Sequence, residues 1–97
     1  MLDDYDYIWD DKKQETNINK HGITFKEAKT AFDDVNGLIK PDPDHSQDEE
    51  RFILIGFSDS SRLLIVCHCY RDNDNTIRII SARKAHKKEW AEYGGVS

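Results

Sequence analysis

Residues 77–83 read Ile77-Arg78-Ile79-Ile80-Ser81-Ala82-Arg83, and this stretch decides the fold. Its β-branched residues predict a strand, and two similar stretches precede it at residues 52–57 and 63–70. The residues between the three stretches, 58–61 and 72–75, have the Ser, Asp and Asn content of turns. We therefore expect an antiparallel meander of three strands.

The chain before the meander predicts a short strand and two helices. Aromatic residues alternate at positions 5, 7 and 9, which is the period of a strand. A polar helix should then run over residues 12–21, with Asp11 as its N-cap and Gly22 as its left-handed C-cap. A second helix should begin at Thr24, because Glu27 follows three residues later, as in a capping box.

The remaining segments complete one small domain. The second helix carries apolar Phe25, Ala28 and Phe32 on one side, a short strand is expected at residues 38–39, and a helix over 85–93 closes the chain. The expected order is βααβ(β)ββα. We expect a single α+β domain over residues 1–97, with a small antiparallel sheet flanked by helices.

Charge and composition narrow the classes of function. No apolar run is long enough to span a bilayer, and the acidic start lacks the pattern of a secretory signal, so we expect a cytoplasmic protein. The net charge of −5 argues against nucleic-acid binding through the overall field. However, residues 1–50 carry net −8 and residues 51–97 carry net +3, and every arginine lies in the second part.

Arg78 and Arg83 are candidates for binding phosphate, because a guanidinium can place two donors on a phosphate group. Regular alternation would put them on opposite faces of the strand, so they converge only if a bulge or the strand end intervenes. The residues alone favour a plainer interpretation, in which both are solubility charges and ion-pair partners of the acidic half.

The first helix presents Lys13, Asn17 and Lys20 on one side, with His21 beside them. Such a side either binds a ligand or is merely solvated. A histidine at a helix C-terminus suits a general acid, although a simple capping role is the commoner explanation. A zinc site at 67–69 is not expected, because alternation sends His68 to the face opposite both cysteines.

A set of short motifs runs in a fixed order along nearly the whole chain. They are Trp9-Asp10, Lys20-His21-Gly22, Phe32-Asp33-Asp34, the stretch 41–45, Glu50-Arg51, Arg62-Leu63, His68 and the stretch 77–83. This ordered set resembles the BrnT family of bacterial type II toxins. The resemblance implies a fold similar to RelE-type ribonucleases and an endoribonuclease that halts translation.

The resemblance also implies a mechanism and partners. RNA would be cleaved by attack of a 2′-hydroxyl on the adjacent phosphate, without a metal ion or another cofactor, and a BrnA-type antitoxin would neutralise the toxin in a complex of two toxins and two antitoxins. On this hypothesis Arg78 and Arg83 stabilise the phosphate, while Lys20 and His21 transfer protons or contact the backbone. The residues expected to position RNA are Lys13, Arg51, Arg62 and Ser81.

A second class of function stays open. The basic half of the chain could instead dock an acidic or amphipathic segment of a partner protein, without catalysis. Cleavage of RNA by the purified protein separates the two interpretations.

Overall fold

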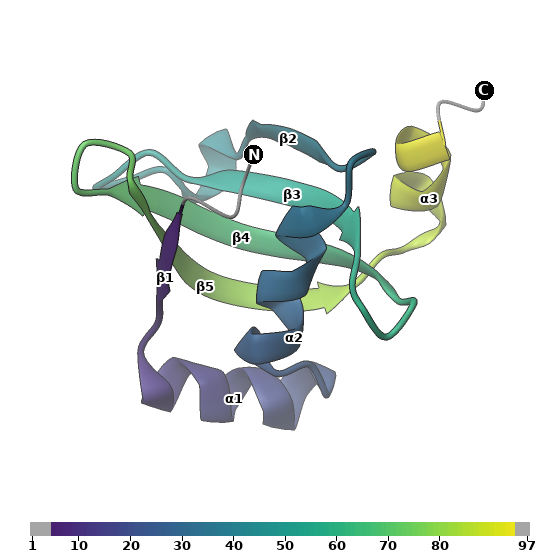
Figure 1. Ribbon diagram of the computed structural model, residues 1–97, viewed down its shortest axis with the longest axis horizontal. Helices are drawn as coiled ribbons and strands as arrows, with labels where there is room; N and C mark the ends of the chain where they lie inside the picture. Colours follow the sequence, from purple (N-terminus) through teal and green to yellow (C-terminus); the bar gives the residue numbers. More distant parts are fainter. Residues whose placement is uncertain (1–4, 95–97) are drawn as a thin grey trace.

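A computed structural model of the chain describes residues 5–94 (Figure 1). The N-terminal residues 1–4 and Gly95, which was expected to end the last helix, lie outside the described residues. The elements are β1 (Asp6–Ile8), α1 (Asp11–His21), α2 (Phe25–Thr30), η2 (Ala31–Asp33), β2 (Leu38–Pro41), η3 (Pro43–His45), β3 (Phe52–Phe57), β4 (Leu63–Arg71), β5 (Thr76–Lys84) and α3 (Lys87–Gly94). The expected α+β class is confirmed.

The strands form one sheet in the order β1-β5-β4-β3-β2. Strands β2 to β5 pair antiparallel, and the predicted three-strand meander is confirmed as β3, β4 and β5. Strand β1 pairs with β5 in parallel, so the sheet is mostly antiparallel, with one parallel pair at this edge that the sequence did not predict. No hairpin joins β1 to β5, and its direction is therefore not dictated by a turn.

Helix α1 is capped one residue earlier than the sequence suggested. The Asp10 carboxylate accepts hydrogen bonds from the backbone N–H groups of Lys12 and Lys13, so Asp10 rather than Asp11 is the N-cap. Gly22 ends the helix with φ of 70°, as predicted. The side chain of Gln14 accepts a hydrogen bond from Phe25 N, which ties α1 to the start of α2.

The main core fills the space between the sheet and helices α1 and α2. Thr24 caps α2 through Glu27 N, as expected, and Phe25, Ala28 and Phe32 are fully buried. We call this side of the sheet the closed face. Its strands contribute Leu54, Leu64, Val66, Ile77, Ile79 and Ala82. A buried side chain of this size contributes about 1.5–3 kcal/mol, so this core is the main source of stability.

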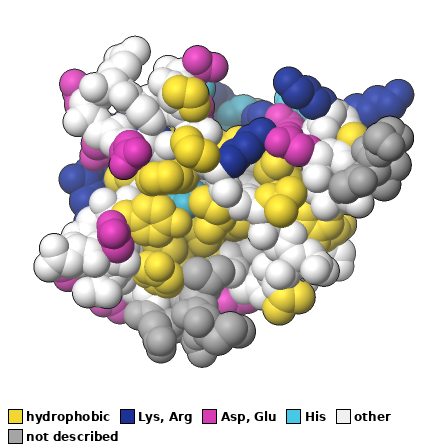
Figure 2. Space-filling view, turned by 90° about the horizontal axis from the view of Figure 1, so that it is seen from above, with side chains coloured by type: hydrophobic (Ala, Val, Ile, Leu, Met, Phe, Trp, Pro, Cys, Tyr) yellow, Lys and Arg dark blue, Asp and Glu magenta, His cyan; other side chains and the backbone are white. Residues whose placement is uncertain are grey.

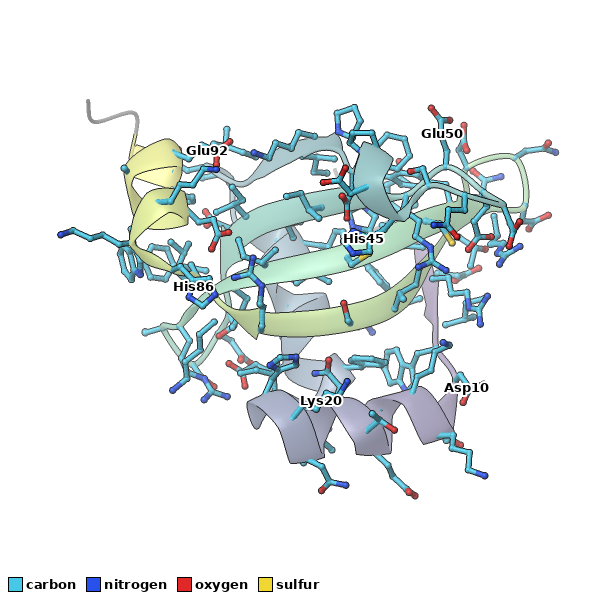
Figure 3. All side chains as sticks on the ribbon, turned by 180° about the vertical axis from the view of Figure 1, so that it is seen from behind. Asp10, Lys20, His45, Glu50, His86 and Glu92 are labelled. Carbon is cyan, nitrogen blue, oxygen red and sulfur yellow. The ribbon has the colours of Figure 1, made fainter. Side chains whose placement is uncertain are left out.

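The other side of the sheet, which we call the open face, is only partly covered. Helix α3 packs on one end of it, where Tyr93 joins a smaller cluster around Ile55, Leu63 and Ile65 (Figure 1). Helix α3 begins at Lys87 rather than at residue 85, because the backbone of Ala85 still bonds to Leu63 O at the end of the sheet. The loop that contains η3 lies in front of another part of this face (Figure 3).

The segment 67–69 alternates as predicted. His68 is fully buried on the closed face, with its ring 4.9 Å from that of Phe32, while Cys67 and Cys69 are free thiols on the other side. Burial lowers the pKa of His68 to about 4, so the ring is neutral in the folded protein. Residues 67–69 therefore contribute side chains to both faces of the sheet.

Strand β2 forms one edge of the sheet and exposes apolar side chains. Leu38 and Ile39 are 40% and 43% exposed, and Figure 2, which looks on the molecule from above, shows apolar side chains gathered there among acidic ones. None of the helices within residues 5–94 is long and apolar enough to cross a membrane.

Candidate functional site

A β-bulge in β5 sets the geometry of the open face. Cys67 pairs with Ser81 and His68 pairs with Ile79, so Ile80 is an extra residue in β5. Ile79 and Ala82 consequently both point into the closed face, although they are three residues apart. The same shift puts Arg78 and Arg83 together on the open face, which resolves the difficulty that regular alternation posed.

Helix α1 is fastened beside the bulge by Asn17. This side chain is only 4% exposed, and its amide accepts from Ala82 N and donates to Ala82 O and Ile23 O, each at 2.9 Å. Strand β1 covers β5 only as far as Arg78, so the Asn17 amide takes the place of a neighbouring strand beyond it. The expectation that Asn17 belongs to a ligand-binding or solvated side is wrong; it is a packing residue.

The open face contains a central hollow of about 460 Å³. Its floor is formed by side chains of β3, β4 and β5, and its walls come from the end of α1 and from the loop with η3. The polar residues that line it are His21, Asp42, His45, Arg51, Ser81 and Arg83.

Two further hollows adjoin the central one. The helix hollow, about 480 Å³, shares His21 and Ser81 with it and adds Lys13 and Lys20. The loop hollow, about 340 Å³, shares His45 and Arg51 and adds Arg71 and Arg78. We call the three together the strip. Figure 3 shows this side of the molecule, with His45 in front of the sheet and Lys20 on α1.

The strip brings together most of the residues that the sequence singled out. Seven of the eight predicted site residues line it: Lys13, Lys20, His21, Arg51, Arg78, Ser81 and Arg83.

Arg62 lies elsewhere and is held in an ion pair. Its guanidinium donates two hydrogen bonds to the carboxylate of Glu27 on α2, and the hydroxyl of Ser58 donates a third to the same carboxylate. The hydrogen bond from Arg62 is the main reason that the pKa of Glu27 lies below its usual value. Arg62 therefore fastens the turn between β3 and β4 to α2, and the structure does not bring it to the strip.

Arg83 is held in place from one side. Its Nη1 and Nη2 donate to the two carboxylate oxygens of Glu89 at 2.9 and 2.8 Å, and Nη1 also donates to Lys84 O. The hydrogen bond from Arg83 is the largest cause that lowers the pKa of Glu89, to about 2. A guanidinium has five N–H donors, so within residues 5–94 these three bonds leave two for a ligand in the central hollow.

Arg51 is incompletely paired. Its Nε is buried and has no hydrogen-bond partner within residues 5–94, because the Glu49 oxygen beside it is 3.7 Å away. The same carboxylate forms an ion pair with Arg71, whose Nη2 lies 2.8 Å from Glu49 Oε1. One carboxylate thus serves two guanidinium groups, which leaves Arg51 able to bind an anion in the central hollow.

Two residues of the central hollow were missed by sequence reasoning. His45 Nδ1 lies 2.9 Å from Asp42 Oδ2, and both side chains reach the hollow from the loop. Neither residue was given a role from the sequence, although the resemblance included the stretch 41–45. Cys67 also lines the hollow, but burial raises the pKa of its thiol, so the group is not a ready nucleophile.

Comparison with known protein families identifies the family of this chain. Residues 9–89 match a family model described as the ribonuclease toxin BrnT of type II toxin–antitoxin systems. The match spans most of the chain and shows that this protein belongs to the BrnT family.

The comparison of structures agrees with this fold. The ribonuclease toxin BrnT of Brucella abortus, solved at 1.1 Å resolution, superposes with a TM-score of 0.65 and 24% sequence identity. The superposition covers 86% of this chain and 99% of the Brucella chain. A search of the curated proteins gave no match.

Proposed function

We propose that this chain is the toxin of a type II module and that it cleaves RNA at the strip without a metal ion. The observation that carries the proposal is the bulge in β5, because it places Arg78 and Arg83 on one face with Lys20 and His21. Cationic donors aimed at a phosphate, with a histidine beside them, are the groups that cleavage by a 2′-hydroxyl requires.

The geometry suggests a role for each group. Arg83 uses the donors that Glu89 leaves open to stabilise the charge that develops on the phosphate oxygens. His21 gives a proton to the leaving 5′-oxygen. Lys13 and Lys20 hold the backbone on one side of that phosphate and Arg78 on the other, while Ser81 contacts the nucleotide between them.

Acidic residues of the loop also border the strip, so the attraction for RNA is local rather than general. Binding should therefore be weak, because only a few phosphates are neutralised, and it should fall as salt is raised, because these contacts are electrostatic. The protein would act in the cytoplasm, where RNA is accessible to it.

We propose further that a BrnA-type antitoxin neutralises the toxin in a complex of two toxins and two antitoxins, and that the antitoxin covers the strip. Co-expression of the neighbouring reading frame should relieve growth arrest. Arrest that persists in the presence of that partner would contradict the pairing.

Purified protein in EDTA tests the activity. It should cleave single-stranded RNA, and Arg83→Ala and His21→Ala should each lower the rate by about 10²–10⁴-fold. Lys26→Ala, on the exposed side of α2, and His86→Ala, before α3, are matched controls that should leave the rate unchanged. Far-UV circular dichroism checks that every variant is folded.

RNA that stays intact with the unaltered protein would overturn the ribonuclease proposal. A non-catalytic binding module would then be favoured by one observation, namely that the Glu89 carboxylate already occupies part of Arg83. An acidic segment of a partner could replace it there. Binding of a Glu-rich peptide, lost in Arg83→Ala, would support that second function.

A further inference from the structure

The loop beside the central hollow holds its histidine in a fixed place. Ser46 Oγ donates to Asp42 O at 2.7 Å and accepts from Arg51 N at 2.8 Å, and Asp42 N donates to Arg51 O at 2.9 Å. These bonds attach η3 to the start of β3. His45 is therefore positioned relative to Arg51 and the floor of the hollow by backbone contacts, and not only by its own side chain.

Asp42 also determines which nitrogen of His45 is available. The 2.9 Å contact between Nδ1 and the Asp42 carboxylate requires a proton on Nδ1, because a carboxylate only accepts. The lone pair of the neutral ring is then on Nε2. The Asp42 side chain is 16% exposed and that of His45 is 65% exposed, so the carboxylate is shielded while the ring stays accessible.

We propose that His45, oriented by Asp42, is the general base of the reaction, opposite His21 as the acid. This inference rests on the proposed ribonuclease activity and deepens it. Both imidazoles line the central hollow, and Arg51 and Arg83 line it with them. A phosphate bound by these two arginines lies between a base that comes from the loop and an acid that comes from α1.

The step balances without a further reactant. His45 Nε2 takes the proton of the 2′-hydroxyl as the 2′-oxygen forms a bond to phosphorus. The bond from phosphorus to the 5′-oxygen breaks, and that oxygen takes a proton from His21. The products are a 2′,3′-cyclic phosphate and a 5′-hydroxyl end.

Two RNA substrates distinguish a base from an acid. In one of them sulfur replaces the bridging 5′-oxygen, and because a thiolate leaves without being protonated, loss of the acid no longer matters. His45→Ala should slow both substrates by about 10²–10⁴-fold, whereas His21→Ala should slow only the ordinary one. His86→Ala is the matched histidine control and should slow neither.

Each outcome of this test is decisive. If the sulfur substrate restores the rate of His45→Ala, His45 is the acid and the assignment is overturned. If His45→Ala cleaves as fast as His86→Ala, His45 has no role in the reaction. If the unaltered protein cleaves neither substrate, the proposed function fails, and the inference fails with it.

Asp42 is a positioning residue, and its variants should separate binding from chemistry. Asp42→Ala should lower kcat by about 10²-fold with KM nearly unchanged, because the ring loses its orientation but the RNA contacts remain. Asp42→Asn keeps an acceptor for Nδ1–H and should recover part of that loss. Asp33→Asn, an exposed residue of η2, is the control. An Asp42→Ala variant with normal kcat would contradict the orienting role.

Discussion

The closed and open faces of the sheet are built from the same strands but have opposite chemistry. On the closed face, Ile77, Ile79 and Ala82 of β5 are apolar and buried under α1 and α2. On the open face, the neighbouring residues of the same strand include Arg78 and Arg83, which line hollows. The buried apolar side chains and the arginines of β5 face opposite sides of the sheet, and the extra residue Ile80 keeps both arginines on the open face.

This difference shows that the backbone of β5 determines both which residues enter the core and which residues line the strip. The bulge changes the face on which Ala82 and Arg83 lie, and Asn17 then binds the backbone of Ala82. The bulge and the hydrogen bonds between Asn17 and the Ala82 backbone therefore determine which residues of β5 lie on the open face. Substitutions on either face of β5, or in Asn17 at its edge, can test this arrangement through the free energy of unfolding, without an assay of catalysis.

A lysine scan across the bulge should give the largest effects. Lysine at Ile79 or Ala82 would place a charge in the closed core and should lower the free energy of unfolding by more than about 4 kcal/mol. Lysine at Ile80 or Ser81 would face the open side and should cost about 1 kcal/mol or less. Urea unfolding measures all four, and a pattern that alternates strictly from 79 to 82 would refute the bulge.

Removal of the Asn17 amide should have the next largest effect. Asn17→Ala leaves the buried N–H and C=O of Ala82 without these partners and should lower the free energy of unfolding by about 3 kcal/mol. Hydrogen exchange at the Ala82 amide should accelerate at the same time. Thr16→Ala, on the exposed side of the same helix, is the control, and equal losses in both variants would show that Asn17 has no special role.

His68 predicts a pH dependence that belongs to the closed face. Its pKa is about 4 in the folded protein and about 6.5 when unfolded, so the unfolded state binds the proton first as pH falls. Stability should therefore decrease by about 2–3 kcal/mol from pH 6.5 to pH 4. His68→Gln should lack this slope in urea titrations, and His86→Gln should keep it. A His68→Gln protein with the original slope would contradict a buried neutral ring.

The ion pair on the open face should give the smallest effect on stability. Glu89 has a pKa of about 2 when folded, against about 4.5 when unfolded, so its contribution is complete above pH 4.5 and is lost as pH falls towards 2. Because the partner Arg83 is partly exposed, Glu89→Gln should cost about 1–2 kcal/mol at pH 7. Glu92→Gln, which alters a more exposed pair with Lys40, should cost less. Equal costs would contradict a special role for the Arg83 pair.

Local signals in the sequence predicted the elements well. Thr24 and Gly22 bound their helices as expected, because a cap is decided by residues within one turn. The meander was recognisable from three β-branched stretches separated by turns. Seven of the eight predicted site residues line the strip, although regular alternation argued against a shared face for Arg78 and Arg83.

Features that depend on distant contacts were not predictable in this way. The direction of β1 is set by pairing with β5, which lies about 70 residues away. Asn17 was taken for a surface residue because its partner, the backbone of Ala82, carries no sequence signal. The bulge did leave a trace, since Ile79 and Ile80 are adjacent and Ala82 follows at an interval that fits no regular strand. Arg62 was grouped with the other arginines because nothing in the sequence pairs it with Glu27.

The bonds from Asn17 to Ala82 also have a consequence for biosynthesis. Helix α1 is made early, but the residue that fastens it is added 65 positions later. Until that part of the nascent chain has left the ribosome, His21 and Lys20 have no strand beside them, and the strip cannot form. If the strip cleaves RNA as proposed, a ribosome that is translating this message is shielded from its own product during elongation.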